Sequence, residues 1–259
     1  MSINVCIPGI SGRMGLEIAK VVNFSSDINL SSATVRKNNS HFDQPISSIL
    51  NYPVNGDNFK ISDNLSLALE NCDVCIDFTH PSYSLEILKT CSEVKKPIVI
   101  GTTGYSSDQE EKIKSYSSQI AIFKSSNMSI GINLCIKALR KVSESVQSTT
   151  KVDIIEHHHQ HKKDMPSGTS LLLESEVKKA NKNLSINHHC IRSGNVVGDH
   201  KILFTLSNEI IEINHRANDR KIFAEGSVEA AKFISNKKAG FFNMDDILIV
   251  FSHATYHLF

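Results

Sequence analysis

The feature that most constrains the fold of this chain is a set of three glycines near its start. Gly9, Gly12 and Gly15 follow an apolar run, 3–8, and precede a stretch with helical character, 16–22. A strand, a glycine turn and a helix in this order can cradle a diphosphate, because glycine lets the backbone approach and the helix start offers free N–H groups. The spacing G-x-x-G-x-x-G is not the common G-x-G-x-x-G, so an ordinary glycine turn is the alternative.

The first half of the chain alternates predicted strands and helices. This alternation, repeated at intervals of about 25 residues, indicates β-α units that form a parallel sheet. The predicted strands are 3–8, 28–35, 74–78, 97–100 and 120–123, and the predicted helices are 16–22, 65–69, 85–94 and one around 109–116.

The second half has a different pattern. Four apolar residues at i, i+4 spacing, from Ile130 to Val142, predict a helix over 130–146 with a buried stripe. Two alternating runs, 202–206 and 210–213, are joined by a short polar turn, which indicates antiparallel or mixed pairing. A further strand is predicted at 152–156, and further helices near 171–180 and at 223–234. We therefore expect two domains.

Composition excludes several classes of protein. Lys and Arg (28) nearly balance Asp and Glu (27), which argues against a dedicated binder of nucleic acid or of anionic membranes. No apolar run approaches the roughly 20 residues that cross a bilayer, and the first residues do not resemble a signal peptide. We expect a soluble, cytoplasmic protein. Its six cysteines lie mostly in apolar segments, where thiols act as small hydrophobic groups, and this holds for the C-x-x-C at Cys72 and Cys75.

The end of the second predicted strand bears on the cofactor. A carboxylate that would hold the ribose 2′-hydroxyl of NAD is missing there, and Arg36 and Lys37 suit a 2′-phosphate instead. We therefore expect NADPH to be used at least as well as NADH, the alternative being two solvated surface charges. The segments 77–81, 101–104 and 125–128 each follow a strand, so they are expected to line one crevice at the carboxyl edge of the sheet.

The most unusual segment is 156–169. Four histidines and two lysines fall within seven residues, at 157–163. Histidine titrates near neutrality and can donate a proton and recover it, and nearby lysines lower its pKa. The Pro-Ser-Gly-Thr turn that follows could bind a carboxylate at a helix start. If the segment is extended, His157, His159 and His161 share one face and could hold zinc; a solvated basic loop is the other alternative.

These motifs together resemble the 4-hydroxy-tetrahydrodipicolinate reductase family, also called dihydrodipicolinate reductase, of bacterial lysine and diaminopimelate synthesis. The resemblance covers nearly the whole chain, and Lys-x-Asp-x-Pro-Ser-Gly-Thr at 162–169 is its most specific part. The matching segments are 9–15, 77–81, 101–104, 127–133, 156–169, 198–200, 215–217, Arg220, 223–226 and 242–248.

The resemblance implies a fold and a reaction. The fold is a Rossmann-like parallel-sheet nucleotide domain (1–127) and a smaller α+β substrate domain with a mixed sheet (128–236), after which the tail (237–259) returns to the first domain. The reaction is the NADPH- or NADH-dependent reduction of a cyclic hydroxy-acid, a small dicarboxylate, to tetrahydrodipicolinate with loss of water. The resemblance also implies a homotetramer that forms through the second domain. No metal is expected, because the histidine segment has no clear carboxylate or cysteine ligand set nearby.

Residue roles follow from the same resemblance. His158 matches the catalytic acid/base and Lys162 the proton donor. His159 matches a substrate-binding position, and Ser167, Gly168 and Thr169 match the turn that holds a substrate carboxylate. The cofactor-binding positions are Gly9, Ile10, Ser11, Gly12, Arg13, Met14, Arg36, Gly101, Thr102, Thr103, Ser125, Ser126, Asn127 and Met128.

The chain departs from the family pattern in three places. Val35 replaces an acidic residue that many members place before the arginine, Met128 stands where an aromatic residue is common, and the stretch 192–200 is shorter than usual, which bears on the oligomer contacts. Two other functions remain open. A nucleotide sensor would bind NADPH without consuming it, and a zinc-dependent hydrolase built on the histidines would contain stoichiometric zinc.

Overall fold

The computed structural model describes residues 2–50, 52–54, 56 and 58–254, which form two compact units. One unit is built from the chain up to Met128 and from Phe223 onward, and the other is Ser129–Ile222. The first unit thus receives the chain again at Phe223, before residue 237, where we expected the return to begin. The assignment of the units to cofactor and substrate stays a prediction.

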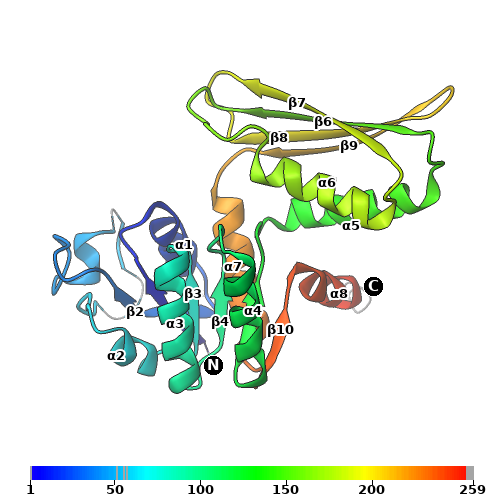
Figure 1. The fold of residues 1–259 in the computed structure, drawn as a ribbon. Coiled ribbons are helices and arrows are strands. Elements are labelled where there is room, and N and C mark those ends of the chain that lie inside the picture. The colour runs from blue at the N-terminus through cyan, green and yellow to red at the C-terminus, as the bar shows by residue number, and fades with distance from the viewer. Residues whose placement is uncertain (1, 51, 55, 57, 255–259) are drawn as a thin grey trace. The chain divides into compact units, whose positions relative to one another are not determined.

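The first unit contains a six-stranded sheet. Its elements are β1 (Ile3–Pro8), α1 (Arg13–Asn23), β2 (Ile28–Thr34), η1 (Ile46–Ser48), α2 (Leu65–Glu70), β3 (Val74–Asp77), α3 (Pro81–Glu93), β4 (Ile98–Ile100), α4 (Ser107–Ser115), η2 (Tyr116–Ser118), β5 (Ala121–Lys124), α7 (Lys221–Ile234), β10 (Gly240–Phe242) and α8 (Met244–Ala254). The strand order is β10-β5-β4-β3-β1-β2, every neighbouring pair is parallel, and α1 and α3 pack against the sheet (Figure 1). The predicted Rossmann-like sheet is confirmed.

Burial in the core of this unit explains why the sequences of its strands are continuous apolar runs. All four residues of β3 are buried, as expected for a central parallel strand that is covered on both faces. Cys6, Cys72, Cys75 and Cys91 lie buried and unoxidised in this core, so they act as small apolar side chains as predicted. Burial raises the pKa of the Cys75 thiol, which makes it a poor nucleophile.

The second unit is a mixed four-stranded sheet with helices on one face (Figure 1). Its elements are α5 (Ile130–Ser145), β6 (Lys151–His158), α6 (Gly168–Ala180), β7 (Ser185–Arg192), β8 (Gly198–Thr205) and β9 (Ile210–Ala217). The strand order is β7-β6-β8-β9, in which β6 and β7 are parallel and the other pairs antiparallel. α5 packs beside α6, and apolar side chains of both helices and of the strands form one core. The predicted mixed sheet is confirmed.

Besides the short 3-10 turn η1, the sequence analysis missed two strands and one helix. β7 is an edge strand whose residues are alternately exposed and half-buried, so it has no apolar run to reveal it. β10 has three residues, too few for a periodic pattern. α8 begins after Asn243, whose side chain accepts a hydrogen bond from the Asp245 amide at 2.8 Å, a capping signal that was present in the sequence. Among the described residues, no helix is long and apolar enough to cross a membrane.

Gly226 on α7 provides a test of this packing. A Cβ atom at this position would overlap the carbonyl oxygen of Met128, so the helix can lie against that backbone only with glycine. We expect Gly226→Ala to lower the free energy of unfolding by about 2 kcal/mol or more, measured by urea denaturation. Gly168→Ala is the matched control, because a Cβ there meets no atom within 4 Å. Equal stability of the two variants would contradict the packing.

Candidate active site

The candidate site is built on the last residues of β6. Along this strand Val152, Ile154, Glu156 and His158 are buried and the residues between them are more exposed, so these four share the face that packs on the helices. The strand was predicted to end at Glu156. It continues to His158, and this extension places a carboxylate and an imidazole side by side on the inner face.

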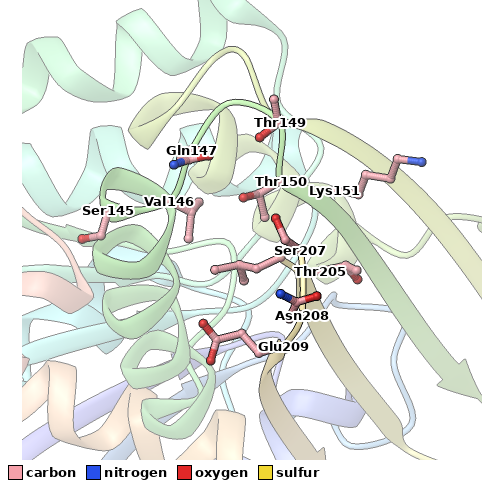
Figure 2. A pocket seen from close by; sticks show the side chains of 11 residues that line it. Ser145, Val146, Gln147, Thr149, Thr150, Lys151, Thr205, Ser207, Asn208 and Glu209 are labelled. Carbon is pink, nitrogen blue, oxygen red and sulfur yellow. The ribbon is translucent and has the colours of Figure 1, made fainter.

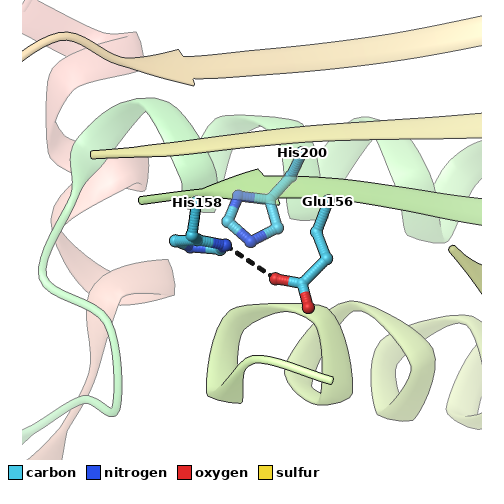
Figure 3. A group of neighbouring side chains, drawn as sticks. All are labelled: Glu156, His158 and His200. Atoms are coloured by element: carbon cyan, nitrogen blue, oxygen red, sulfur yellow. Dashed lines mark ion pairs between the residues drawn. The ribbon is translucent and has the colours of Figure 1, made fainter. Parts of the chain in front are cut away.

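Glu156 is fully buried and its two oxygens have different partners. Oε1 accepts hydrogen bonds from Nη2 of Arg192 at 2.7 Å and from the backbone N–H of Ser167 at 3.0 Å. Oε2 lies 2.8 Å from Nδ1 of His158 (Figure 3). Burial raises the pKa of Glu156, but the bonds from Arg192 and Ser167 outweigh it and lower the pKa to about 2. Glu156 is therefore an anion at neutral pH.

His158 is held on both sides of its ring. Nδ1 lies 2.8 Å from Oε2 of Glu156, without the alignment of a hydrogen bond. Nε2 points toward Gly198, where a Cβ would lie 3.0 Å away, so the glycine keeps space at this nitrogen. The ring of His200 meets that of His158 edge-on, with centroids 5.1 Å apart. The pKa of His158 is lowered chiefly by burial, against the opposing effect of Glu156, and Lys162 lowers it further.

The loop after β6 brings Lys162 to the same end of the sheet. Its Nζ lies 2.9 Å from Oδ2 of Asp164, and its side chain is 22% exposed. His159 is half-buried and donates its backbone N–H to the carbonyl of Val196 at 2.8 Å. Arg192 Nη2 also donates to the carbonyl of Asp164 at 2.7 Å, which fastens the loop to β7.

The predicted carboxylate turn forms the start of α6. Ser167 is the N-cap: its Oγ accepts from the Ser170 amide at 3.2 Å and lies 3.2 Å from Nε2 of His200. Gly168 is exposed with open space around its Cα, and Thr169 is half-buried. The structure thus brings His158, Lys162 and this turn together within one unit. Arg192, Gly198 and His200 carried no predicted role, although 198–200 was among the matching segments.

The zinc set envisaged for an extended segment does not form. β6 ends at His158, so His159 and His161 leave the strand, while His157 on the outer face contacts Oγ of Ser193 at 2.8 Å. Among the described residues, Glu156, His158 and His200 have donor atoms within 4.8 Å of one another, close enough to surround a metal ion. Glu156 and His158 already contact each other, and His200 contacts Oγ of Ser167.

In the first unit, the glycine turn lies between β1 and α1 as predicted. Gly9 has a φ of +69°, a conformation that glycine adopts readily, and the helix cap, Gly12, has no side chain to occupy the first amides of α1. A cavity of about 360 Å³ adjoins the turn. It is lined by the predicted Gly9, Ser11, Gly12 and Arg36, and by Val35, Asn39, Phe78, Thr79, His80 and Tyr83. Such a cradle of glycines, free amides and a cation suits a dinucleotide.

The other predicted cofactor residues do not line this cavity. Arg13 and Met14 begin α1 and Ile10 is buried, so Ile10 can contribute only its backbone. Gly101, Thr102 and Thr103 follow β4, and Ser125, Ser126, Asn127 and Met128 follow β5 at the same carboxyl edge.

A buried carboxylate that the sequence analysis did not single out organises these loops. Asp77, at the end of β3, accepts hydrogen bonds from the hydroxyls of Thr79 (2.6 Å) and Thr102 (3.1 Å) and from Ser84. The Thr102 hydroxyl oxygen accepts a hydrogen bond from the backbone N–H of Thr79 at 2.8 Å. A Cβ on Gly101 would overlap the ring of Phe78, so with any other residue at this position the ring would have to move.

A larger hollow, of about 680 Å³, lies at the opposite end of the second sheet (Figure 2). It is formed by the end of α5, the start of β6 and the β8–β9 turn, and it is lined mainly by hydroxyl and amide side chains with Lys151 and Glu209 at exposed positions. It contains no buried titratable cluster among the described residues, so volume alone does not mark it as the reactive site.

A dinucleotide cradle on a parallel sheet, with a carboxylate-paired imidazole and an ammonium group in a second unit, defines a pyridine-nucleotide-dependent reductase. Residues 3–128 match the family described as "Dihydrodipicolinate reductase, N-terminus", and residues 131–248 match its "C-terminus". The chain belongs to the dihydrodipicolinate reductase family.

Individual relatives agree with this. The 4-hydroxy-tetrahydrodipicolinate reductase of Wigglesworthia glossinidia brevipalpis is 41% identical over 252 residues, which cover 95% of this chain and 93% of that protein. The enzyme of the same name from Buchnera aphidicola subsp. Schizaphis graminum is 37% identical over 265 residues, 94% of this chain and 96% of that protein. In fold, the chain is similar to the dipicolinate-bound dihydrodipicolinate reductase of Paenisporosarcina sp. TG-14, with a TM-score of 0.79, 23% identity and coverage of 95% and 100%.

Family membership confirms the predicted function: the chain is an oxidoreductase of lysine and diaminopimelate biosynthesis, a reductase of 4-hydroxy-tetrahydrodipicolinate. It also confirms a pyridine nucleotide as the cofactor. The choice between NADH and NADPH and the roles of the individual residues are not decided by it.

Burial of His200 predicts a pH-dependent stability. Burial, together with the neighbouring His158, lowers the pKa of His200 from 6.5 to about 4. Below pH 6.5 the unfolded chain binds a proton that the folded chain does not, so stability falls as the pH falls toward 4. We expect this loss between pH 7 and pH 4.5 to be about 2 kcal/mol smaller in His200→Gln, measured by urea unfolding. An identical pH dependence in both proteins would contradict a buried, neutral His200.

Proposed function

We propose that the reduction takes place at the carboxyl end of β6, with His158 as the acid/base and Lys162 as the proton donor. The observation that carries this is the buried Glu156–His158 pair, because it fixes Nδ1 of the imidazole and leaves Nε2 facing the space beside Gly198. Lys162 is near enough to influence the pKa of the same imidazole. Two groups that can exchange protons thus lie at one open end of the sheet.

We further propose that a substrate carboxylate binds between Lys162 and the start of α6. Asp164, a carboxylate of the chain itself, supports this, since it lies 2.9 Å from Nζ of Lys162 and also accepts a hydrogen bond from the backbone of Gly168. Burial raises the pKa of Asp164, but these donors outweigh it and lower the pKa. An ammonium group and the N–H groups of a helix start therefore attract a carboxylate at this point. His159 borders the same loop.

The chemistry follows from these groups. When bound, NADPH or NADH supplies the hydride. Loss of water takes one proton from a ring carbon and delivers one to the departing hydroxyl, and addition of hydride leaves a negative charge that one further proton must quench. His158 can pass the first proton through Nε2, and the ammonium of Lys162 can donate the second.

For the cofactor, we propose that NADPH is used at least as well as NADH. Among the described residues that line the cavity there is no Asp or Glu to bind a ribose 2′-hydroxyl, while Arg36 stands at its rim beside Asn39. An exposed guanidinium can pair with a 2′-phosphate through two parallel hydrogen bonds.

We also propose that the enzyme is a cytoplasmic homotetramer, as the family resemblance implies. Exposed apolar residues on the two edge strands of the second sheet, Ile191 on β7 (46% exposed) and Ile210 on β9 (56%), support assembly through that unit. Sedimentation equilibrium tests the assembly, and a monomer at micromolar concentration would contradict it.

The role assignments are tested by following the absorbance of NADPH with enzymatically generated substrate. We expect His158→Ala and Lys162→Ala to lower turnover by a factor on the order of hundreds, because proton transfer is lost, and Lys162→Ala to raise the KM for the dicarboxylate as well. The Kd of NADPH should be nearly unchanged, because neither residue lines the cavity at the glycine turn. Lys163→Ala is the matched control, since Lys163 is exposed and adjacent in sequence. Near-normal turnover in both variants would overturn the assignment.

The cofactor proposal is tested at Arg36. We expect Arg36→Ala to raise the KM for NADPH by about tenfold and to leave the KM for NADH almost unchanged, because only NADPH carries the 2′-phosphate. Lys20→Ala, at the other end of α1, should change neither value. If the wild-type protein strongly prefers NADH, the proposal is wrong.

A further inference from the structure

We infer that Glu156 is a positioning residue that holds the His158 imidazole and the carboxylate-binding turn in one arrangement. This inference deepens the proposed function and rests on it. Glu156 is fully buried, and one carboxylate connects three segments: His158 on its own strand, Arg192 on β7 and Ser167 at the start of α6.

The division of the two oxygens fixes what the carboxylate can do. Oε1 carries both hydrogen bonds, from Arg192 at 2.7 Å and from Ser167 at 3.0 Å. These bonds compensate the cost of burying the charge and hold the plane of the carboxylate. Oε2 lies 2.8 Å from Nδ1 of His158, and the thiol of Cys190 on β7 also donates a hydrogen bond to the carboxylate. Oε2 is therefore the oxygen that faces the imidazole (Figure 3).

Two consequences for His158 follow. A carboxylate at Nδ1 favours the tautomer with its proton on Nδ1, so that Nε2 is the nitrogen available for proton exchange. The same negative charge favours the imidazolium, which opposes the burial and the cations that disfavour it. The charged and titratable groups that face His158 are Glu156 on β6, Arg192 on β7, His200 on β8, and Lys162 and Asp164 on the loop.

A third consequence concerns the substrate. Glu156 accepts a hydrogen bond from the backbone N–H of Ser167, which is the N-cap of α6. The substrate carboxylate is proposed to bind at this same helix start. Movement of the Glu156 side chain would therefore shift the imidazole and the turn together. A residue that only stabilised the fold would not be expected to couple these two groups.

Glu176 provides a matched control in the same unit. It is also buried and ion-paired, with Nε of Arg140 at 2.5 Å and Nζ of Lys179 at 2.7 Å. These partners lie on the helices α5 and α6, whereas Glu156 contacts the site residues. The substitutions Glu156→Gln and Glu176→Gln each remove one buried charge and leave arginine without its carboxylate. Glu176→Gln therefore controls for the loss of a buried carboxylate in this unit, whereas only Glu156→Gln changes the surroundings of His158.

The experiment compares these variants with the wild-type enzyme in the NADPH assay across pH. We expect Glu156→Gln to lower kcat by about tenfold or more, to raise the KM for the dicarboxylate, and to move the limb of the pH profile that belongs to His158 toward lower pH by about half a unit or more, with the Kd of NADPH unchanged. Glu176→Gln should leave kcat and the profile unchanged. Equal effects of both variants, or a loss of kcat in Glu156→Gln with an unmoved profile, would overturn the inference.

A second measurement needs no variant that might fail to fold. The nitrogen chemical shifts of the His158 ring in the wild-type protein, assigned by comparison with His158→Gln, report the tautomer directly. We expect the proton on Nδ1; a proton on Nε2 in the neutral ring would overturn the inference. If the wild-type protein consumes no NADPH with substrate, the proposed function fails, and the tautomer still decides the role of Glu156.

Discussion

The ion-paired carboxylate of Glu156 is the interaction on which the candidate site depends. A buried anion is costly unless it is paired and hydrogen-bonded, so β6 can carry it only because β7 supplies Arg192 and the start of α6 supplies the Ser167 amide. The same guanidinium binds the carbonyl of Asp164 and thereby fixes the loop that presents Lys162. One buried charge therefore accounts for the positions of the imidazole, the ammonium group and the helix cap.

The first unit solves a similar problem in a different way. Asp77 is also a buried carboxylate at the end of a strand, but hydroxyl and amide groups surround it where Glu156 has a guanidinium. Burial therefore prevails and raises the pKa of Asp77, whereas the pKa of Glu156 is lowered to about 2. Hydrogen bonds from hydroxyl groups to Asp77 orient the loops after β3 and β4, and they add no fixed positive charge beside this carboxylate. The cationic surroundings are concentrated in the second unit, where a dianionic substrate is proposed to bind.

The sequence predicts the parts of this arrangement that depend on local pattern. Apolar runs separated by glycine turns identify the parallel sheet, and the histidine–lysine segment identifies the site. The pairing of Glu156 with His158 could not be read from the sequence, because histidines give no apolar signal and the predicted strand stopped at Glu156. Arg192 was missed for a different reason. It lies on an edge strand without an apolar run, and it reaches Glu156 only through the parallel register that pairs His158 with Arg192. Non-local pairing of this kind leaves little local trace.

The central claim is that the reacting groups meet at the end of β6. The most direct test is a crystal structure of the protein with NADPH and pyridine-2,6-dicarboxylate bound together. The account predicts one carboxylate of this ligand between Lys162 and the first turn of α6, with the nicotinamide ring facing the ligand and Nε2 of His158 directed toward it. A dicarboxylate bound elsewhere, with His158 and Lys162 contacting neither the ligand nor the nicotinamide, would contradict the account.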